Sequence, residues 1–139
     1  MIKLPETTRK KQFLVVDDYE SMRTLISEHL QQLGVERILV ANSGNEGLKI
    51  IKQNLNTDNQ IDFILIDMVM EDGSGLDLVK SLRAVETFKS LPILMISSKS
   101  EIGLVIECVK AGVTHYIVKP WQLDDLARKI SDSILKVKN

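Results

Sequence analysis

Acidic, hydroxyl and amino side chains follow four of the apolar segments in this sequence, each where a segment ends. These side chains are Asp17, Asp18, Asp67, Ser97 and Lys119. Three carboxylates with a hydroxyl and an ammonium are suited to bind a divalent cation and to stabilise an added negative group. That chemistry requires a fold that brings the five positions together.

Each group also has a simple structural explanation. An aspartate pair after a strand is commonly a turn or a helix N-cap, and Ser97 could cap the helix that follows it. Lys119 could be a solvated charge at the end of a strand. Three clustered carboxylates are harder to explain in this way, because they raise one another's pKa unless a cation holds them. Mg²⁺ is the natural candidate, since it commonly takes one or two carboxylates with water and phosphate oxygens.

The charges of such a site also favour the acceptance of a phosphoryl group. The three carboxylates are balanced by Mg²⁺ together with Lys119, so the occupied site is near neutral, and an acyl phosphate adds roughly one further negative charge. The hydroxyl of Ser97 and the ammonium of Lys119 are suitable donors to the new oxygens. An aspartate nucleophile that becomes an aspartyl phosphate is an established mode of covalent catalysis.

Five short apolar segments predict the strands that carry these groups. None of them alternates apolar with polar residues, so we expect both faces of each strand to be covered. This pattern is typical of a parallel sheet between two layers of helices. The segments span residues 13–16, 38–41, 63–66, 93–96 and 116–118.

Apolar residues recur at helical spacing between and after these segments. Gly34 and Gly112 are predicted to end the first and the fourth helix, and the polar residues 54–60 are predicted to form a loop. The helical patterns span residues 22–33, 48–51, 76–82, 102–109 and 123–134.

Strict alternation of strands and helices predicts an α/β domain with a doubly wound, five-stranded parallel sheet. Right-handed crossovers favour the flavodoxin-like strand order 2-1-3-4-5, with helices on both faces. In such sheets the ligand site lies at the carboxyl ends of the strands. The candidate residues all follow strand ends, so the fold class supports the site.

Composition limits the remaining possibilities. A chain of 139 residues fits one domain, and we expect a flexible extension over residues 1–11 before it. The net charge of −1 gives no reason to expect direct nucleic-acid binding, and no apolar run is long enough for membrane insertion. The single cysteine, Cys108, suits a reducing cytoplasm.

The pattern resembles the receiver domains of bacterial two-component response regulators, especially the single-domain chemotaxis type. The resemblance covers most of the chain and places the receiver domain at residues 12–139. Its matching positions are Asp17, Asp18, Asp67, Gly75, Ser97 and the pair Lys119 and Pro120.

The resemblance implies a role for each matching residue. Asp67 is identified as the phosphoacceptor, and Mg²⁺ would be held by Asp18, by Asp17 largely through water, by Asp67 and by the backbone carbonyl of Val69. Glu71 departs from the family pattern, which has proline there, so we expect a less rigid loop and a fourth carboxylate close by.

The resemblance also implies a switch that acts on the output surface. Ser97 would move towards the phosphoryl group, Lys119 would pair with its oxygens, and the Lys119–Pro120 bond would be cis. Tyr116 is similar to the aromatic residue that changes rotamer on activation, although an ordinary packed aromatic residue is an equally good explanation.

The resemblance further implies the partners. A sensor histidine kinase or phosphotransfer protein would supply the phosphoryl group, and the surface of residues 101–110, Tyr116 and the last helix would bind a downstream protein. That target could be a motor switch, a kinase or a phosphatase. The protein would catalyse only its own phosphorylation and dephosphorylation.

Three other functions fit the sequence less well. An aspartate-nucleophile phosphatase usually has an acid two residues after the nucleophile, where this chain has Val69. A flavin-binding domain would not crowd acids at the strand ends. An interaction module that works without phosphorylation would not need the complete set of acids and donors.

Overall fold

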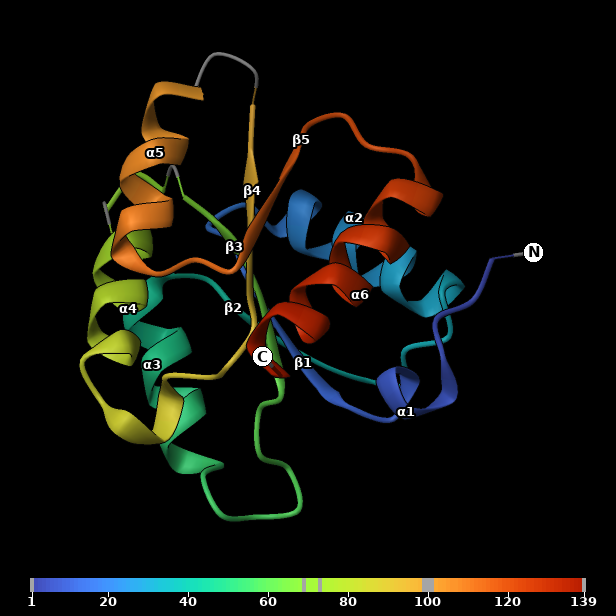
Figure 1. Ribbon diagram of the computed structural model, residues 1–139, viewed down its shortest axis with the longest axis horizontal. Coiled ribbons are helices and arrows are strands. Elements are labelled where there is room, and N and C mark those ends of the chain that lie inside the picture. The colour runs from blue at the N-terminus through green and yellow to red at the C-terminus, as the bar shows by residue number, and fades with distance from the viewer. Residues whose placement is uncertain (1, 69, 73, 99–101, 139) are drawn as a thin grey trace.

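Five parallel strands form the central sheet of the computed structural model, in the order β2-β1-β3-β4-β5 (Figure 1). The structure describes residues 2–68, 70–72, 74–98 and 102–138. The fold class and the strand order predicted from the sequence are confirmed. The strands are β1 (Gln12–Val16), β2 (Arg37–Ala41), β3 (Phe63–Asp67), β4 (Ile93–Ser97) and β5 (His115–Val118).

Helices cover both faces of the sheet, α3, α4 and α5 on one side and α2 and α6 on the other (Figure 1). Within the described residues, no helix is both long and apolar enough to cross a bilayer. The helices are α1 (Glu6–Arg9), α2 (Glu20–Gln32), α3 (Gly44–Gln53), α4 (Ser74–Arg83), α5 (Ile102–Ala111) and α6 (Leu123–Lys138), with a 3₁₀ turn, η1 (Glu86–Phe88).

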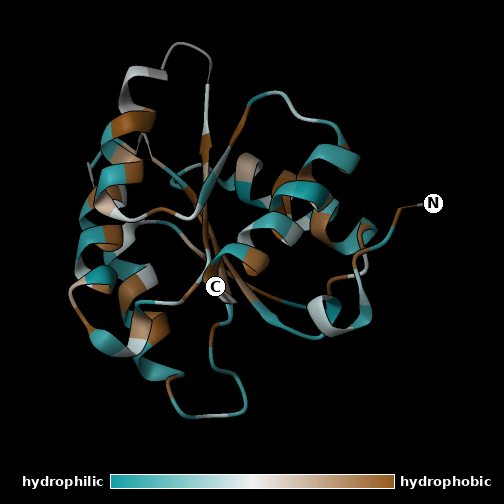
Figure 2. Ribbon diagram, in the orientation of Figure 1, coloured by the Kyte–Doolittle hydropathy of each residue, from teal (hydrophilic) through white to brown (hydrophobic). Residues whose placement is uncertain are grey.

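The strand residues divide between two hydrophobic cores, one on each face of the sheet. In β1, Leu14 and Val16 belong to the core under α3, α4 and α5, whereas Phe13 and Val15 belong to the core under α2 and α6. Figure 2 shows hydrophobic residues along the strands and hydrophilic residues on the outer sides of the helices. Alternate side chains therefore fill opposite cores, which is why the strand sequences show no polar alternation.

Complete burial holds for the three central strands and not for the two at the edges. Every residue of β1, β3 and β4 is buried, but β2 is mostly half-buried and its Val40 is 46% exposed. The expectation that both faces of every strand are covered therefore holds only in part for β2, where Leu39 and Ile38 pack against the two cores but stay half-buried. An edge strand has a neighbour on one side only, so the covering helices do not close over it fully.

Glycines end the two helices where the sequence predicts them. Gly34 follows α2 with a φ of +96°, and Gly112 follows α5 with a φ of +116°. Both values lie in the left-handed region that glycine adopts without a steric penalty. These turns return the chain to the sheet and so set where β2 and β5 begin.

The N-terminal residues contact the domain, which the sequence does not predict. Leu4 is 3% exposed, and its N–H donates to the carbonyl of Leu33 at 2.9 Å. The short helix α1 follows, and the Glu36 N–H donates to the Arg9 carbonyl at 3.3 Å. The flexibility of residues 1–11 stays a prediction.

Candidate functional site

Strand order and register bring the predicted site residues to one edge of the sheet. β3 lies between β1 and β4, and β5 lies beside β4. Asp67 is paired with Ile96 and Ser97 with Val118, so the last residues of β3, β4 and β5 lie within one residue of the same height. Because parallel strands end on the same side, the residues that follow them share this carboxyl edge.

Lys119 and Asp67 form an ion pair at the centre of this edge. The Lys119 Nζ lies 3.2 Å from Asp67 Oδ2, with the Asp67 side chain 5% exposed and that of Lys119 28% exposed. The Lys119 N–H also donates to the Ser97 carbonyl at 2.7 Å, which ties the end of β5 to the end of β4. The Lys119–Pro120 bond is cis, as the resemblance implies.

Asp17 is completely buried beside this pair. The pKa of Asp17 is raised from 3.8 to about 6, chiefly by burial. The Tyr19 N–H, which donates to Asp17 Oδ1 at 2.9 Å, opposes this shift, and the negative charge of Asp67 adds to it. The buried carboxylate of Asp17 is therefore harder to ionise than one exposed to solvent.

Asp18, which follows β1, is hydrogen-bonded to the loop after β3. Its Oδ2 accepts a hydrogen bond from the Glu71 N–H at 3.0 Å. The main chain at Glu71 therefore supports the acidic pair, a contact that the sequence does not predict. Val69, whose carbonyl is an expected metal ligand, lies outside the described residues.

Gly75 permits the close approach of α4 to the end of β3. A Cβ added at Gly75 would lie 3.0 Å from the Asp67 carbonyl oxygen and 3.2 Å from Met70 Cε. The backbone contact cannot be relieved by a side-chain movement, so a larger residue would push α4 away from the site. The matching glycine of the family pattern thus has a steric reason in this chain.

Three buried polar atoms at this edge have no hydrogen-bond partner among the described residues. They are Asp17 Oδ2, Asp18 Oδ1 and Ser97 Oγ. Such atoms are uncommon, because a buried polar group without a partner is costly. Two unpaired carboxylate oxygens and one hydroxyl are the groups that a cation and a phosphoryl oxygen would satisfy.

The donors fit Mg²⁺ better than a metal that needs a full set of protein ligands. Among the described residues, no three acidic, histidine or cysteine side chains are arranged to hold a metal ion by themselves. Mg²⁺ keeps several waters and commonly uses one or two carboxylates with phosphate oxygens. The open oxygens of Asp17 and Asp18 are suited to that role.

Arg23 supports the acidic loop and is not singled out by the sequence analysis. Its Nη1 donates to the carbonyl of Asp17 at 2.8 Å from the second turn of α2. A charged donor holds this carbonyl more strongly than a neutral donor would. The sequence signal that could have identified Arg23 is its position, because it is a cation five residues after Asp18, in the helix that follows the acidic pair.

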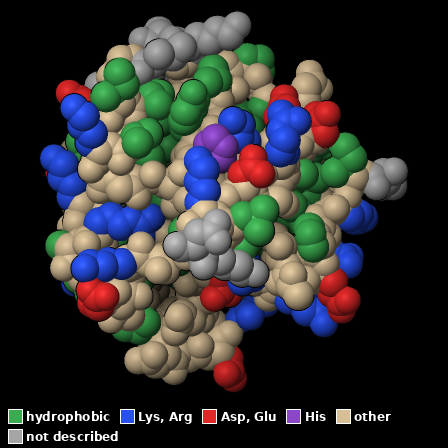
Figure 3. All heavy atoms as spheres, in the orientation of Figure 1, with side chains coloured by type: hydrophobic (Ala, Val, Ile, Leu, Met, Phe, Trp, Pro, Cys, Tyr) green, Lys and Arg blue, Asp and Glu red, His purple; other side chains and the backbone are tan. Residues whose placement is uncertain are grey.

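The expected output surface is formed by α5, β5 and α6. On α5, Ile106 is 62% exposed and Val109 is 53% exposed, and hydrophobic side chains gather over this part of the molecule in Figure 3. Tyr116 is half-buried on β5, with Lys129 Nζ 5.5 Å from its ring centre. A cavity of about 310 Å³ lies beside Tyr116 and Lys129. Glu101 lies outside the described residues.

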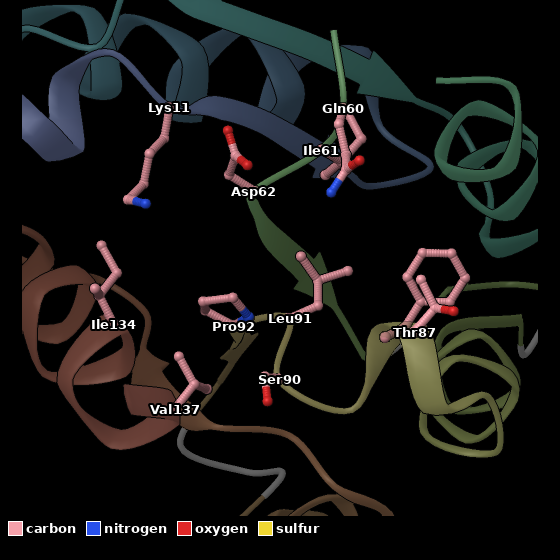
Figure 4. Close-up of a pocket in the computed structure, with 11 residues that line it drawn as sticks. Lys11, Gln60, Ile61, Asp62, Thr87, Ser90, Leu91, Pro92, Ile134 and Val137 are labelled. Atoms are coloured by element: carbon pink, nitrogen blue, oxygen red, sulfur yellow. The ribbon is translucent and has the colours of Figure 1, made fainter. Parts of the chain in front are cut away.

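A second hollow lies at the opposite end of the sheet and contains none of the predicted site residues. Its volume is about 280 Å³, and Figure 4 shows Lys11 and Asp62 on one side of it and Ile134 and Val137 of α6 on another. Asp62 Oδ2 accepts a hydrogen bond from the Gln12 N–H at 2.9 Å. The carboxylate of Asp62 thus supports the main chain at the start of β1.

Known proteins share this sequence pattern and fold. The sequence model of the response regulator receiver domain family matches residues 13–131. Chemotaxis protein CheY1 of Helicobacter pylori is 41% identical over 117 residues, 84% of this chain and 91% of that protein. Chemotaxis protein CheY-3 of Vibrio cholerae is 34% identical over 122 residues, 88% of this chain and 90% of that protein.

Solved structures agree with the sequence comparison. A response regulator receiver domain protein from Clostridium thermocellum superposes with a TM-score of 0.78 at 27% identity, covering 92% of this chain and 97% of that one. A putative response regulator from Chloroflexus aurantiacus gives a TM-score of 0.81 at 27% identity, covering 91% and 98%. The chain belongs to the family of response regulator receiver domains.

Proposed function

We propose that this protein is a phosphorylation-activated switch in which Asp67 accepts a phosphoryl group and thereby changes a protein-binding surface. Its family makes it a signalling regulator of two-component or chemotaxis pathways and not a metabolic enzyme. One observation carries the proposal: Asp67 is buried within 3.2 Å of the Lys119 ammonium, beside unpaired buried oxygens of Asp17, Asp18 and Ser97.

The proposed reaction transfers a phosphoryl group from a phosphohistidine to Asp67. An Asp67 carboxylate oxygen forms a bond to phosphorus, the phosphorus–nitrogen bond breaks, and the electron pair returns to the imidazole nitrogen. Bound Mg²⁺ would supply positive charge to the phosphoryl oxygens. Lys119 can then pair with those oxygens, and Ser97 can donate its unpaired hydroxyl to one of them.

The phosphoryl group would act on the output surface through Ser97 and Tyr116. Ser97 is the last residue of β4 and is paired with Val118 of β5, two residues after Tyr116. A movement of Ser97 towards the new oxygens would therefore shift the connection between the site and β5. The exposed Ile106 and Val109 of α5 support the proposal that this face binds a downstream protein.

The proposed donor is a sensor histidine kinase or a phosphotransfer protein, and the proposed targets are a motor switch, a kinase or a phosphatase. The chemotaxis proteins with 34–41% identity support a chemotaxis role. The free thiol of Cys108 is buried on α5, which agrees with the proposed cytoplasmic location.

Incubation with acetyl phosphate and Mg²⁺, followed by intact-mass measurement, tests the proposal. We expect a gain of one phosphoryl group in the wild type and none in Asp67→Asn or in the presence of a chelator. Asp62→Asn is the matched control, because Asp62 lies at the opposite end of the sheet. No mass gain in the wild type, or a full gain in Asp67→Asn, would exclude Asp67 as the acceptor.

A further inference from the structure

A hydrogen bond between two aromatic side chains fixes the connection that carries Lys119. The indole Nε1 of Trp121 donates to Nδ1 of His29 at 3.1 Å. The two rings are nearly perpendicular, at 87°, with centres 5.9 Å apart. His29 lies on α2, and Trp121 follows Lys119 and Pro120 directly, so this contact ties α2 to the β5–α6 connection.

Lys119 is already held to the sheet by its N–H, which donates to the Ser97 carbonyl at 2.7 Å, and the Trp121–His29 bond adds a tie to α2. His29, Trp121 and Lys119 line a cavity of about 200 Å³. The other three lining residues, Met22, Leu25 and Pro120, are apolar. The Trp121–His29 bond is thus a specific polar tie in a mostly apolar contact, two residues from the ammonium that pairs with Asp67.

The hydrogen bond requires a neutral His29. Its Nδ1 accepts, so the ring must carry its proton on Nε2. Protonation places a hydrogen on Nδ1, where it faces the Trp121 N–H, and the bond is lost. The contact therefore depends on the charge state of the imidazole.

Charged residues lie on each element near this contact. Lys119 lines the same cavity from the β5–α6 connection, and Glu28 adjoins His29 on α2. Asp124 and Asp125 lie in the first turn of α6, three and four residues after Trp121. From the N-terminal segment, Lys3 shares a second cavity with Gln32 and Leu123.

We propose that His29 is a positioning residue for Lys119, which it holds through Trp121 only while its imidazole is neutral. Protonation of His29 releases Trp121, loosens the connection and moves the ammonium away from its place against Asp67. The catalytic consequence rests on the proposed function, because Lys119 matters for the rate only if Asp67 accepts a phosphoryl group. The structural consequence does not depend on it.

Fluorescence of the unphosphorylated protein tests the structural step, because Trp121 is the single tryptophan in the sequence. We expect the emission of Trp121 to change when the pH is lowered from about 8 to about 5. His29→Asn should abolish it, since the asparagine oxygen takes the place of Nδ1 and does not titrate. The amide resonance of Lys119 should shift with pH in the wild type and stay fixed in His29→Asn.

His115→Asn is the matched control for the second histidine. Burial, together with the nearby Lys129 and Lys136, lowers the pKa of His115 to about 4, so His115 stays neutral over this range. The titration should therefore remain in His115→Asn. Loss of the titration there, or its persistence in His29→Asn, would overturn the proposal.

The rate of phosphorylation by acetyl phosphate tests the catalytic step. At about pH 8 we expect His29→Leu to react about fivefold more slowly, the loss that one neutral hydrogen bond implies, and His29→Asn to recover most of the rate. The rate of the wild type relative to His29→Asn should fall as the pH is lowered. A wild-type rate in His29→Leu would overturn the positioning role. No phosphorylation of the wild type, with the fluorescence titration intact, would contradict the proposed function alone.

Discussion

The two ends of the sheet hold buried polar groups in opposite ways. At the carboxyl edge, Asp17, Asp18 and Ser97 each keep a buried polar atom without a partner in the described structure. At the amino ends of β4 and β5, the half-buried guanidinium of Arg83 donates to several oxygens. They are the carbonyls of Phe88 at 2.7 Å, Leu91 at 2.7 Å and Gly112 at 2.8 Å.

This difference separates stability from chemistry. The Arg83 contacts join the end of α4, the turn η1 and the start of β5, and they satisfy main-chain oxygens that have left regular structure. The open oxygens at the carboxyl edge destabilise the metal-free protein and are available to a ligand. We therefore expect substitutions at Arg83 to lower stability and substitutions at the carboxyl edge to change binding.

Arg83→Met should cause the largest loss of stability. The substitution keeps an unbranched apolar chain but leaves three carbonyl oxygens without their donor, so we expect unfolding to become easier by about 2–4 kcal/mol. Urea denaturation measures this change. Phosphorylation of the folded variant by acetyl phosphate should stay within about twofold of the wild type.

Arg83→Lys is the matched variant, because it keeps the charge but has a single nitrogen in place of the planar fork. Its stability should lie between those of the wild type and Arg83→Met. Equal stability of all three proteins would show that the carbonyls find other donors, and the contrast between the two ends of the sheet would then be lost.

Asp17→Asn should have the opposite effect and stabilise the metal-free protein. The pKa of Asp17 is about 6 in the folded state and near 3.8 when unfolded, so the charged form is penalised by folding. The stabilisation that protonated Asp17 gives to the folded state is complete below about pH 4 and is lost as the pH rises through 6. At pH 7.5 in chelator we expect Asp17→Asn to be more stable by about 2 kcal/mol.

Thermal unfolding with and without Mg²⁺ completes this test. Mg²⁺ should raise the melting temperature of the wild type and have less effect on Asp17→Asn, because a ligand stabilises only the form that binds it. If Asp17→Asn destabilises the protein in chelator, the buried Asp17 carboxylate does not lower the stability of the metal-free protein. The proposed contrast between the two ends of the sheet would then be wrong at the carboxyl edge.

The fold follows from features that the sequence displays directly. Unbroken apolar segments predict buried parallel strands, and Gly34 and Gly112 predict the helix ends, because both signals depend on local residue types. The set of residues at the carboxyl edge is also predictable, since it requires only the strand order. The roles assigned to Asp67, Ser97 and Tyr116 stay predictions.

The contacts between distant segments are not predictable in the same way. Arg23 on Asp17, Arg83 on three carbonyls and Trp121 on His29 join residues through side-chain geometry. No periodicity in the sequence reports which carbonyl a long side chain reaches. The packing of Leu4 against α2 is missed for a related reason, because one apolar residue in a polar terminus carries little signal.

Alanine substitutions of the two glycines at the ends of α5 should have the smallest effects on stability. At Gly112, the φ of +116° strains any other residue, and an added Cβ would lie 2.5 Å from Arg83 Cγ. Gly112→Ala should therefore cost about 1–2 kcal/mol, because it disturbs the Arg83 contacts from the opposite side. Gly103 lies in the first turn of α5 and is exposed, and among the described residues no atom lies within 4 Å of an added Cβ. Gly103→Ala should stabilise the protein by about 0.5–1 kcal/mol through helix propensity alone.

Urea denaturation of the Arg83→Met and Gly112→Ala double variant then decides whether the two residues act together. A loss smaller than the sum of the single losses would show that both substitutions break the same contacts, whereas strict additivity would show that Gly112 matters only for its own backbone.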